Sequence, residues 1–172
     1  MLKKIGIVIA NFIKTLKLNE VVFIFIVPTT ITIISYLFCN LKVEIFNEFA
    51  ADFNDTIINV TSLLASFGLA ALSILISSSS VNIEKAKRDV TKRKDINNKL
   101  ISYYKLQVIR NFFTLFIQLI LLILALMFKF IIEGELGIKI YFYIEIFLLN
   151  ISIFSQIFVV VSIYYLFVTD KG

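Results

Sequence analysis

The stretch FTLFIQLILLILALMF, residues 113–128, decides the fold class of this chain. It carries no charge, and Gln118 is its one amide. A helix of a soluble bundle would instead place polar residues on its outer face at the helical period. The stretch therefore predicts a helix that crosses a membrane.

The rest of the chain is similarly apolar. Hydrophobic residues make up 59% of the 172 residues, and the mean hydropathy is +0.94, whereas soluble domains are about half apolar. A helix needs about 20 apolar residues to cross ~30 Å of hydrocarbon. Four uncharged stretches approach or exceed that length: residues 21–38, 56–83, 111–128 and 146–169. We therefore expect four transmembrane helices.

These observations predict an all-α, polytopic membrane protein with a single membrane domain, residues 1–172. The N-terminus is expected to be an amphipathic helix on the inner leaflet, because Lys3, Lys4, Lys14 and Lys17 gather on one arc of a helical wheel. The predicted segments are the amphipathic leader 1–19, the first helix 21–39, an acidic outer loop 40–56, the second helix 57–81, a basic cytoplasmic helical hairpin 82–106, the third helix 107–131, an outer turn 132–139 and the fourth helix 140–168.

The 17 Lys and Arg residues set the predicted orientation. Most of them lie in the leader and in residues 82–110, whereas the loop 40–56 is acidic. Loops rich in Lys and Arg stay on the cytoplasmic side of a membrane. We therefore predict a multi-pass protein of the bacterial cytoplasmic (inner) membrane with both termini in the cytoplasm.

The composition includes few of the side chains that commonly take part in catalysis. Histidine and tryptophan are absent, and Cys39 is the one cysteine. Thiol–imidazole pairs, disulfides within the chain and nearly every transition-metal site are thereby excluded. The sequence also has no glycine loop of the phosphate-binding type. We expect no enzymatic activity and no cofactor.

Polar residues inside the predicted spans are the best indicators of packing or function, because they are costly in hydrocarbon. The second helix repeats small residues at helical spacing, which allows another helix to approach closely or a pore to be lined. Amides in the third and fourth helices are expected to hydrogen-bond between helices. The candidates for packing or for a pore lining are Ser62, Ser66, Gly68, Ala70, Ser73, Gln118, Asn150 and Gln156.

Glu145 is the one acid well inside a predicted span. Lys129, near the outer end of the third helix, could meet it across the short turn as an intramembrane charge pair. A side chain that reaches the membrane surface is the alternative structural interpretation. An acid without a partner would instead favour an ion or proton site.

The predicted hairpin is strongly basic. Anionic lipid head groups attract such a cluster by about 1 kcal/mol per charge, and a cytosolic effector protein is a second candidate partner. Direct contact with nucleic acid is disfavoured, because no aromatic residues interleave with the cations. The expected docking residues are Lys85, Lys87, Arg88, Lys92, Arg93 and Lys94.

The stretch LLASFGLAALSILISSSS, residues 63–80, precedes this charged segment. A small-residue second helix that leads into a basic cytoplasmic arm resembles small four-helix membrane proteins of prokaryotic anti-phage defence systems, particularly the membrane subunit of the Kiwa system. The resemblance is one of architecture and transfers no functional residue. It implies a homo-oligomer in the inner membrane that senses infection at the bilayer and works with a soluble cytoplasmic partner.

Three functions remain open at this point. The first is a non-enzymatic sensor or scaffold that couples a membrane event to a cytosolic partner in anti-phage defence. The second is an oligomeric pore of the holin or channel type. The third is a small transporter subunit, for which two broken helices near the middle of the membrane would be expected.

Overall fold

The computed structural model describes residues 2–39, 42–131 and 135–168. Within them, four helical segments are long and apolar enough to cross a membrane, which confirms the predicted helical class and the predicted number of such segments. These candidate spans are Leu18–Phe38, Val43–Ser77, Tyr103–Phe128 and Gly137–Phe167.

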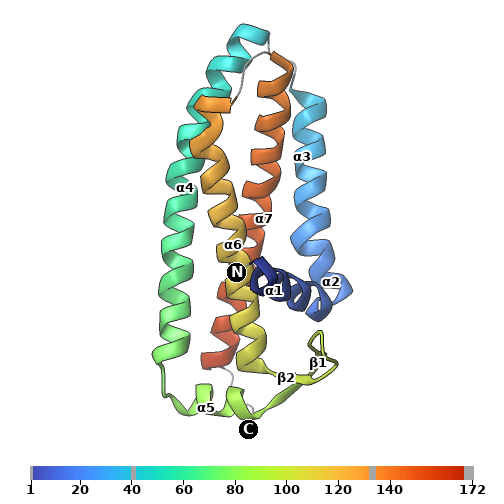
Figure 1. Cartoon of the computed structure of the whole chain (residues 1–172), viewed down its shortest axis with the longest axis vertical. Helices are drawn as coiled ribbons and strands as arrows, with labels where there is room; N and C mark the ends of the chain where they lie inside the picture. Colours follow the sequence, from blue (N-terminus) through green and yellow to red (C-terminus); the bar gives the residue numbers. More distant parts are fainter. Residues whose placement is uncertain (1, 40–41, 132–134, 169–172) are drawn as a thin grey trace.

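The bundle is built from long helices and a shorter composite one (Figure 1). In chain order the elements are α1 (Leu2–Thr15), α2 (Leu18–Val21), the π-helix η1 (Val22–Ile26), α3 (Val27–Phe38), α4 (Val43–Ser77), α5 (Val81–Arg88), β1 (Val90–Lys94), β2 (Leu100–Ser102), α6 (Tyr103–Ile131) and α7 (Glu135–Val168).

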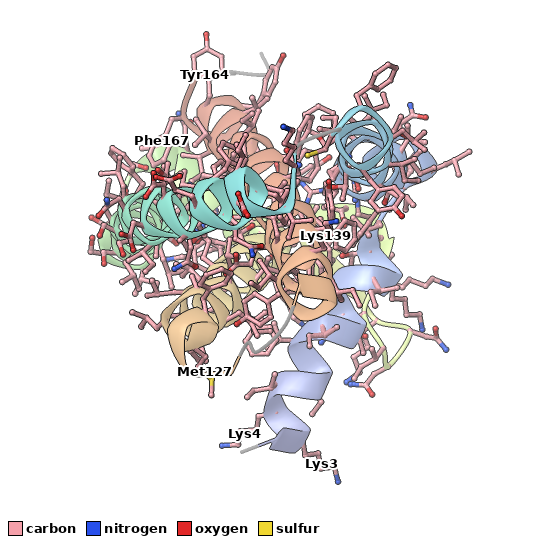
Figure 2. The ribbon with its side chains drawn as sticks, turned by 90° about the horizontal axis from the view of Figure 1, so that it is seen from above. Lys3, Lys4, Met127, Lys139, Tyr164 and Phe167 are labelled. Carbon is pink, nitrogen blue, oxygen red and sulfur yellow. The ribbon has the colours of Figure 1, made fainter. Side chains whose placement is uncertain are left out.

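The long helices α4, α6 and α7 pack together, and α3 packs on α7 (Figure 1). Helices α4 and α7 run in the same direction along the bundle, and α6 runs in the opposite one. We call the end that carries α5, β1 and β2 the hairpin end, and the end where α3 finishes and α4 begins the far end. Seen along the bundle, α1 projects sideways with Lys3 and Lys4 at its outer end (Figure 2).

Gly68 brings α4 and α6 close together. A Cβ atom at this position would lie 2.8 Å from the Cδ2 atom of Leu115 on α6. Real side-chain carbons do not approach so closely, so a larger residue would push the helices apart or displace Leu115. The absence of a side chain at Gly68 therefore allows α4 and α6 to approach closely at this level.

The first span is interrupted by a π-helical turn. Pro28 lies in the first turn of α3 and has no N–H to donate to the preceding turn. The π-helix η1 comes directly before it, and the N–H of Val27 bonds to the carbonyl of Val22. The wider turn keeps the segment continuous where a regular α-helix would lose a hydrogen bond.

The predicted loop 40–56 differs from the structure, because α4 already begins at Val43. The acidic residues that suggested a loop are exposed on one side of this helix, while apolar residues and an amide are buried on the other. The uncharged stretch 56–83 thus indicates where the apolar part of this helix begins, whereas the helix itself begins at residue 43. The exposed acids are Glu44, Glu48, Asp52 and Asp55, and the buried residues are Phe46, Ala50 and Asn54.

The predicted helical hairpin 82–106 also differs from the structure. Only α5 is helical before α6, and β1 and β2 form an antiparallel β-hairpin. The turn needs no glycine or proline, because the Oδ1 atom of Asp95 accepts hydrogen bonds from the N–H groups of Asn97 and Lys99. Asn98 adopts a positive φ of 60°, which asparagine tolerates better than most residues. These local bonds compete successfully with a helix.

The predicted boundaries of the second helix and of the outer turn also differ from the structure. The second helix ends at Ser77, and Ser80 caps α5 by accepting a hydrogen bond from the N–H of Ile83 at 3.4 Å. In the predicted outer turn 132–139, residues 135–139 belong to α7, and residues 132–134 lie outside the described part of the chain.

Candidate functional site

The hairpin end contains an ion cluster centred on Glu20. This carboxylate lies in α2, at the start of the first span. Its Oε1 atom accepts hydrogen bonds from Nη2 of Arg93 at 2.5 Å and from Nη2 of Arg110 at 2.9 Å. All three side chains are at most 15% exposed. One acid thus binds one arginine from the β-hairpin and one from α6.

The geometry of Arg93 is bidentate. Its Nη1 atom donates to Oε2 of Glu20 at 2.6 Å and also to the backbone carbonyl of Thr15 at the end of α1. Paired, charge-assisted hydrogen bonds of this kind are stronger than single ones and fix orientation as well as distance. The β-hairpin is therefore bound to both sides of the junction between α1 and the first span.

Arg110 extends the cluster to α7. Its Nη1 atom donates to Oγ of Ser162 at 3.3 Å, and its guanidinium lies 4.3 Å from the ring centroid of Phe158. The cluster therefore connects α2, β1, α6 and α7. Two cations face one anion, so the cluster keeps a net positive charge.

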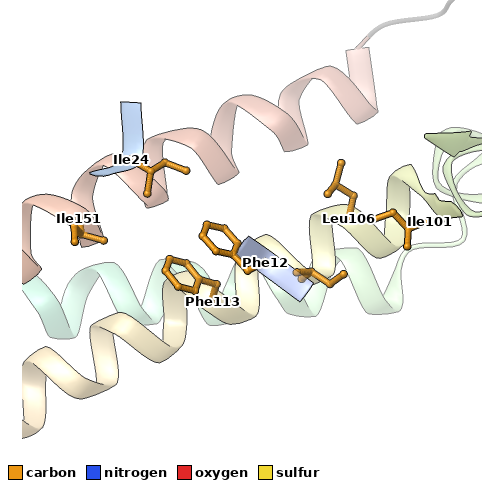
Figure 3. Packing of buried hydrophobic residues seen from close by; sticks show 7 residues of the cluster. Phe12, Ile24, Ile101, Leu106, Phe113 and Ile151 are labelled. Atoms are coloured by element: carbon orange, nitrogen blue, oxygen red, sulfur yellow. The ribbon is translucent and has the colours of Figure 1, made fainter. Parts of the chain in front are cut away.

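Helix α1 is held between the β-hairpin and α6. Lys14 donates to Oδ1 of Asn98 at 2.8 Å, and Asn11 accepts a hydrogen bond from the N–H of Ile96 at 2.9 Å. On its other side, the ring of Phe12 stacks on Phe113 with centroids 3.6 Å apart (Figure 3). The leader is thus docked on the protein as well as projecting from it.

Asp95 stabilises the turn that contacts α1. Its carboxylate is 6% exposed and lies 3.2 Å from Nζ of Lys105. The N–H of Lys99 and the cation of Lys105 together hold the pKa of Asp95 below its usual range. The turn is therefore built around an ionised acid.

A pocket of about 700 Å³ opens beside the ion cluster, among α5, β1, α6 and α7. Five cationic side chains and a single acid, Asp89, contribute to its lining. Such a site favours an anion, and phosphate groups match cations of this kind well. The cationic residues are Lys17, Lys85, Lys92, Arg93 and Arg110.

The six predicted docking cations do not form one surface. Lys85 and Lys92 line the pocket, and Arg93 belongs to the ion cluster as well. Lys87 pairs with Glu84 at 2.7 Å, and the Nε atom of Arg88 donates to the carbonyl of Glu84 at 3.4 Å. Lys94 is exposed on β1.

The packing candidates divide between two faces of α4. Gly68 faces α6, whereas the stripe formed by Ser62, Ser66, Ala70 and Ser73 is exposed on the outside of the bundle. In the interior, Gln118 donates to Gln156 at 3.1 Å and so joins α6 to α7. Asn150 donates instead to the carbonyl of Ile146 in its own helix.

Glu145 is completely buried. Neither of its carboxyl oxygens has a hydrogen-bond partner among the described residues. The predicted pair with Lys129 falls outside them, because the side chain of Lys129 is not described. Within the described chain, no group of three His, Cys, Asp or Glu side chains could hold a metal ion.

Sequence reasoning overlooked the centre of the ion cluster and part of the buried polar set. Glu20 and Arg110 lie immediately before the uncharged stretches 21–38 and 111–128, where the sequence pattern does not distinguish them from other charges that flank a span. Asn54, Thr61 and Asn111 are buried polar residues on inward faces. Their recurrence with other polar residues at intervals of about two helical turns is the signal that could have revealed them.

Comparisons with known proteins identify no relative: no protein family, no curated protein and no solved structure matches the chain.

Proposed function

We propose that the protein is a non-enzymatic sensor or scaffold of the inner membrane that couples a membrane event to a cytosolic partner. The observation that carries this proposal is the ion cluster, in which Glu20 at the start of the first span binds Arg93 of the β-hairpin. The excess of Lys and Arg at the hairpin end supports a cytoplasmic location for that end. The architectural resemblance supports a setting in anti-phage defence.

The cluster supplies a physical link between the membrane and the cytoplasm. Separating Glu20 from its arginines would leave mostly buried charges without partners, which costs about 3–5 kcal/mol in proteins. A shift of the first span relative to α6 therefore either moves the β-hairpin with it or breaks the cluster. Either result changes the surface that the hairpin end presents.

Two surfaces at the hairpin end support the proposed partners. The cationic pocket suits the phosphate of an anionic lipid head group, and its position beside the spans suits contact with the membrane surface. The exposed cations of β1, Lys92 and Lys94, are accessible to a cytosolic effector.

The exposed small-residue stripe on α4 supports a homo-oligomer. Small side chains allow close helix packing in membranes, and this stripe is exposed in the described part of the chain. The same stripe favours a pore as the second candidate function, since a ring of subunits could turn its serines inward. However, the hydroxyl of Ser66 already donates to the carbonyl of Ser62 in its own helix.

The sensor proposal is tested with Arg93→Gln and, as a matched control, Lys99→Gln, which removes an exposed cation of the same β-hairpin that is not among the proposed docking residues. Bacteria that express each variant at equal membrane levels are challenged with phage, and the cytosolic proteins that co-purify are compared. We expect Arg93→Gln to lose protection and its partner, and Lys99→Gln to keep both. Full activity of Arg93→Gln would contradict coupling through the cluster, and conductance of the purified protein in liposomes would favour the pore.

A further inference from the structure

A column of buried polar side chains runs through the core formed by α4, α6 and α7. Each member is at most 1% exposed and carries at least one polar atom without a partner among the described residues. Buried polar groups are normally satisfied, and each exception calls for an explanation. The members are Asn54, Thr61, Asn111, Gln118, Glu145, Ser152 and Ser155.

The column is periodic on all three helices. Asn54 and Thr61 on α4 are about two helical turns apart, as are Asn111 and Gln118 on α6. Two turns correspond to about 10 Å along a helix and return to the same face. Glu145 and Ser152 follow the same interval on α7. The polar residues therefore stack in layers rather than being scattered.

Glu145 lies in the last layer of this column on the side of the far end of the bundle. Ile57 of α4 packs in one cluster with Leu148 and Leu149 of α7. Helices α4 and α7 run in the same direction. Asn54 and Glu145 precede these residues by three or four positions, so both lie in the layer about one turn towards the far end. Thr61 and Ser152 share the layer one turn towards the hairpin end.

The column continues to the cationic pocket. Beyond the layer of Ser152, Gln118 donates to Gln156. Asn111 and Gln107 follow on the same face of α6, and Gln107 donates to the carbonyl of Val159. Gln107 also lines the cationic pocket, which opens at the hairpin end. Groups that can hydrogen-bond thus lead from that pocket to Glu145.

No cation faces Glu145 in the described part of the chain. On α4 the inward residue at this level is Asn54, while Asp52 and Asp55 are exposed on the outer side. On α6 the buried residues at this level are Ala125 and Phe128. The side chain of Lys129 on the same helix is not described.

The remaining titratable groups near this level are tyrosines, one lysine and Cys39, which packs against the cluster of Phe46 and Phe142. Tyr141 of α7 donates its hydroxyl hydrogen to the carbonyl of Leu124, and Tyr36 of α3 packs against Tyr143. Lys139 lies over the ring of Phe46, nearer the far end. An ionised carboxylate without a counter-charge would be very costly in this interior. A neutral carboxyl removes that cost and can both donate and accept a hydrogen bond.

We propose that Glu145 is a proton-binding site inside the membrane bundle and that it exchanges its proton with the hairpin end through the polar column. When a proton arrives from water in the pocket, it adds to one carboxylate oxygen and leaves a neutral acid. Neither Glu145 nor any residue of the column belongs to the ion cluster, although Arg93 and Arg110 of that cluster also line the pocket at the end of the column.

The test is infrared spectroscopy of the full chain in lipid nanodiscs at neutral pH. The wild type and the exposed-acid control Asp52→Asn should show the carbonyl band of a protonated carboxyl, and Glu145→Gln should lack it. A wild type without this band, or Glu145→Gln that retains it, would overturn the proton site. Transfer of the wild type into deuterated buffer should shift the band, which identifies it as a carboxyl without any variant.

The route is tested by the rate of that isotope shift. Thr61→Val keeps the shape of the side chain but removes its hydroxyl, so it should slow the exchange at Glu145 several-fold. The exposed control Thr56→Val should leave the rate unchanged. Equal rates in wild type and Thr61→Val would overturn the route, and a loss of thermal stability in both Glu145→Gln and Lys129→Gln would show a structural ion pair instead.

Discussion

Glu20 and Arg93 are 73 residues apart in the sequence, and their side chains meet in two parallel hydrogen bonds of 2.5 and 2.6 Å. This pair joins a residue at the start of a membrane span to the β-hairpin outside it. Arg110 binds the same carboxylate from α6. The conformation of the β-hairpin is therefore tied to the packing of two spans.

Arg93→Gln should destabilise the protein by on the order of 3 kcal/mol, because it leaves the mostly buried Glu20 with one guanidinium in place of two. Equilibrium unfolding in detergent measures the loss. The exposed neighbour Lys94→Gln is the control and should lie within about 0.5 kcal/mol of wild type. Equal stability of the two variants would mean that the pair contributes little.

Gly68→Ala should cost about 1–3 kcal/mol, the usual range for overpacking a close helix contact. The added Cβ atom would lie 2.8 Å from a carbon of Leu115, so either α4 and α6 separate or the Leu115 side chain is displaced. Thermal unfolding of the purified variant measures the change. Ala70→Gly, on the exposed face of the same helix, controls for the effect of helix propensity. If the thermal stability of Gly68→Ala equals that of the wild type, the side chain of Leu115 moves aside without cost.

Ser66→Leu should weaken the homo-oligomer while leaving the fold of the single chain intact, since Ser66 is exposed on the small-residue stripe. Cross-linking in native membranes measures the oligomer. Leu63→Ile, also exposed on α4 but outside the stripe, should leave it unchanged. Undiminished cross-linking of Ser66→Leu would exclude the stripe as the interface between copies.

The β-hairpin turn should loosen in acid. Asp95 has a pKa held below its usual value of about 3.9 by the N–H of Lys99 and by Lys105. Its stabilising bonds are therefore complete above that usual value and are lost as the pH falls through the lowered one. Hydrogen exchange at Lys99, corrected for the intrinsic pH dependence, should show this loss in wild type. Asp95→Asn should show no such step. Identical pH profiles in the wild type and in Asp95→Asn would contradict the prediction that ionised Asp95 holds the turn.

The number of spans could be predicted from the sequence because it depends on uninterrupted apolar length, as in residues 113–128. The helical start of α4 could not be predicted from the sequence. Its exposed acidic residues suggest a loop, but they are compatible with a helix that buries Phe46 and Ala50 on its other side. The β-hairpin depends on local bonds of Asp95 that no periodicity displays.

The ion cluster was harder still to predict. Glu20, Arg93 and Arg110 are far apart in the sequence, and nothing local distinguishes them from the solvated charges around them. Glu145 stood out as an intramembrane acid, but only the three-dimensional packing shows that Asn54 shares its layer. Residue pairings that depend on the register between helices therefore cannot be predicted from the sequence pattern.

The most direct test of the central claim is the distance distribution between spin labels on Lys94 of β1 and Ile33 of α3, measured in lipid nanodiscs. Both side chains are exposed, so the labels should not disturb packing. The account predicts a narrow distribution in the labelled wild-type background and in the control Glu84→Gln, and a broad or shifted one in Glu20→Gln. A distribution that stays narrow and unshifted in Glu20→Gln would contradict the claim that this carboxylate couples the β-hairpin to the first span.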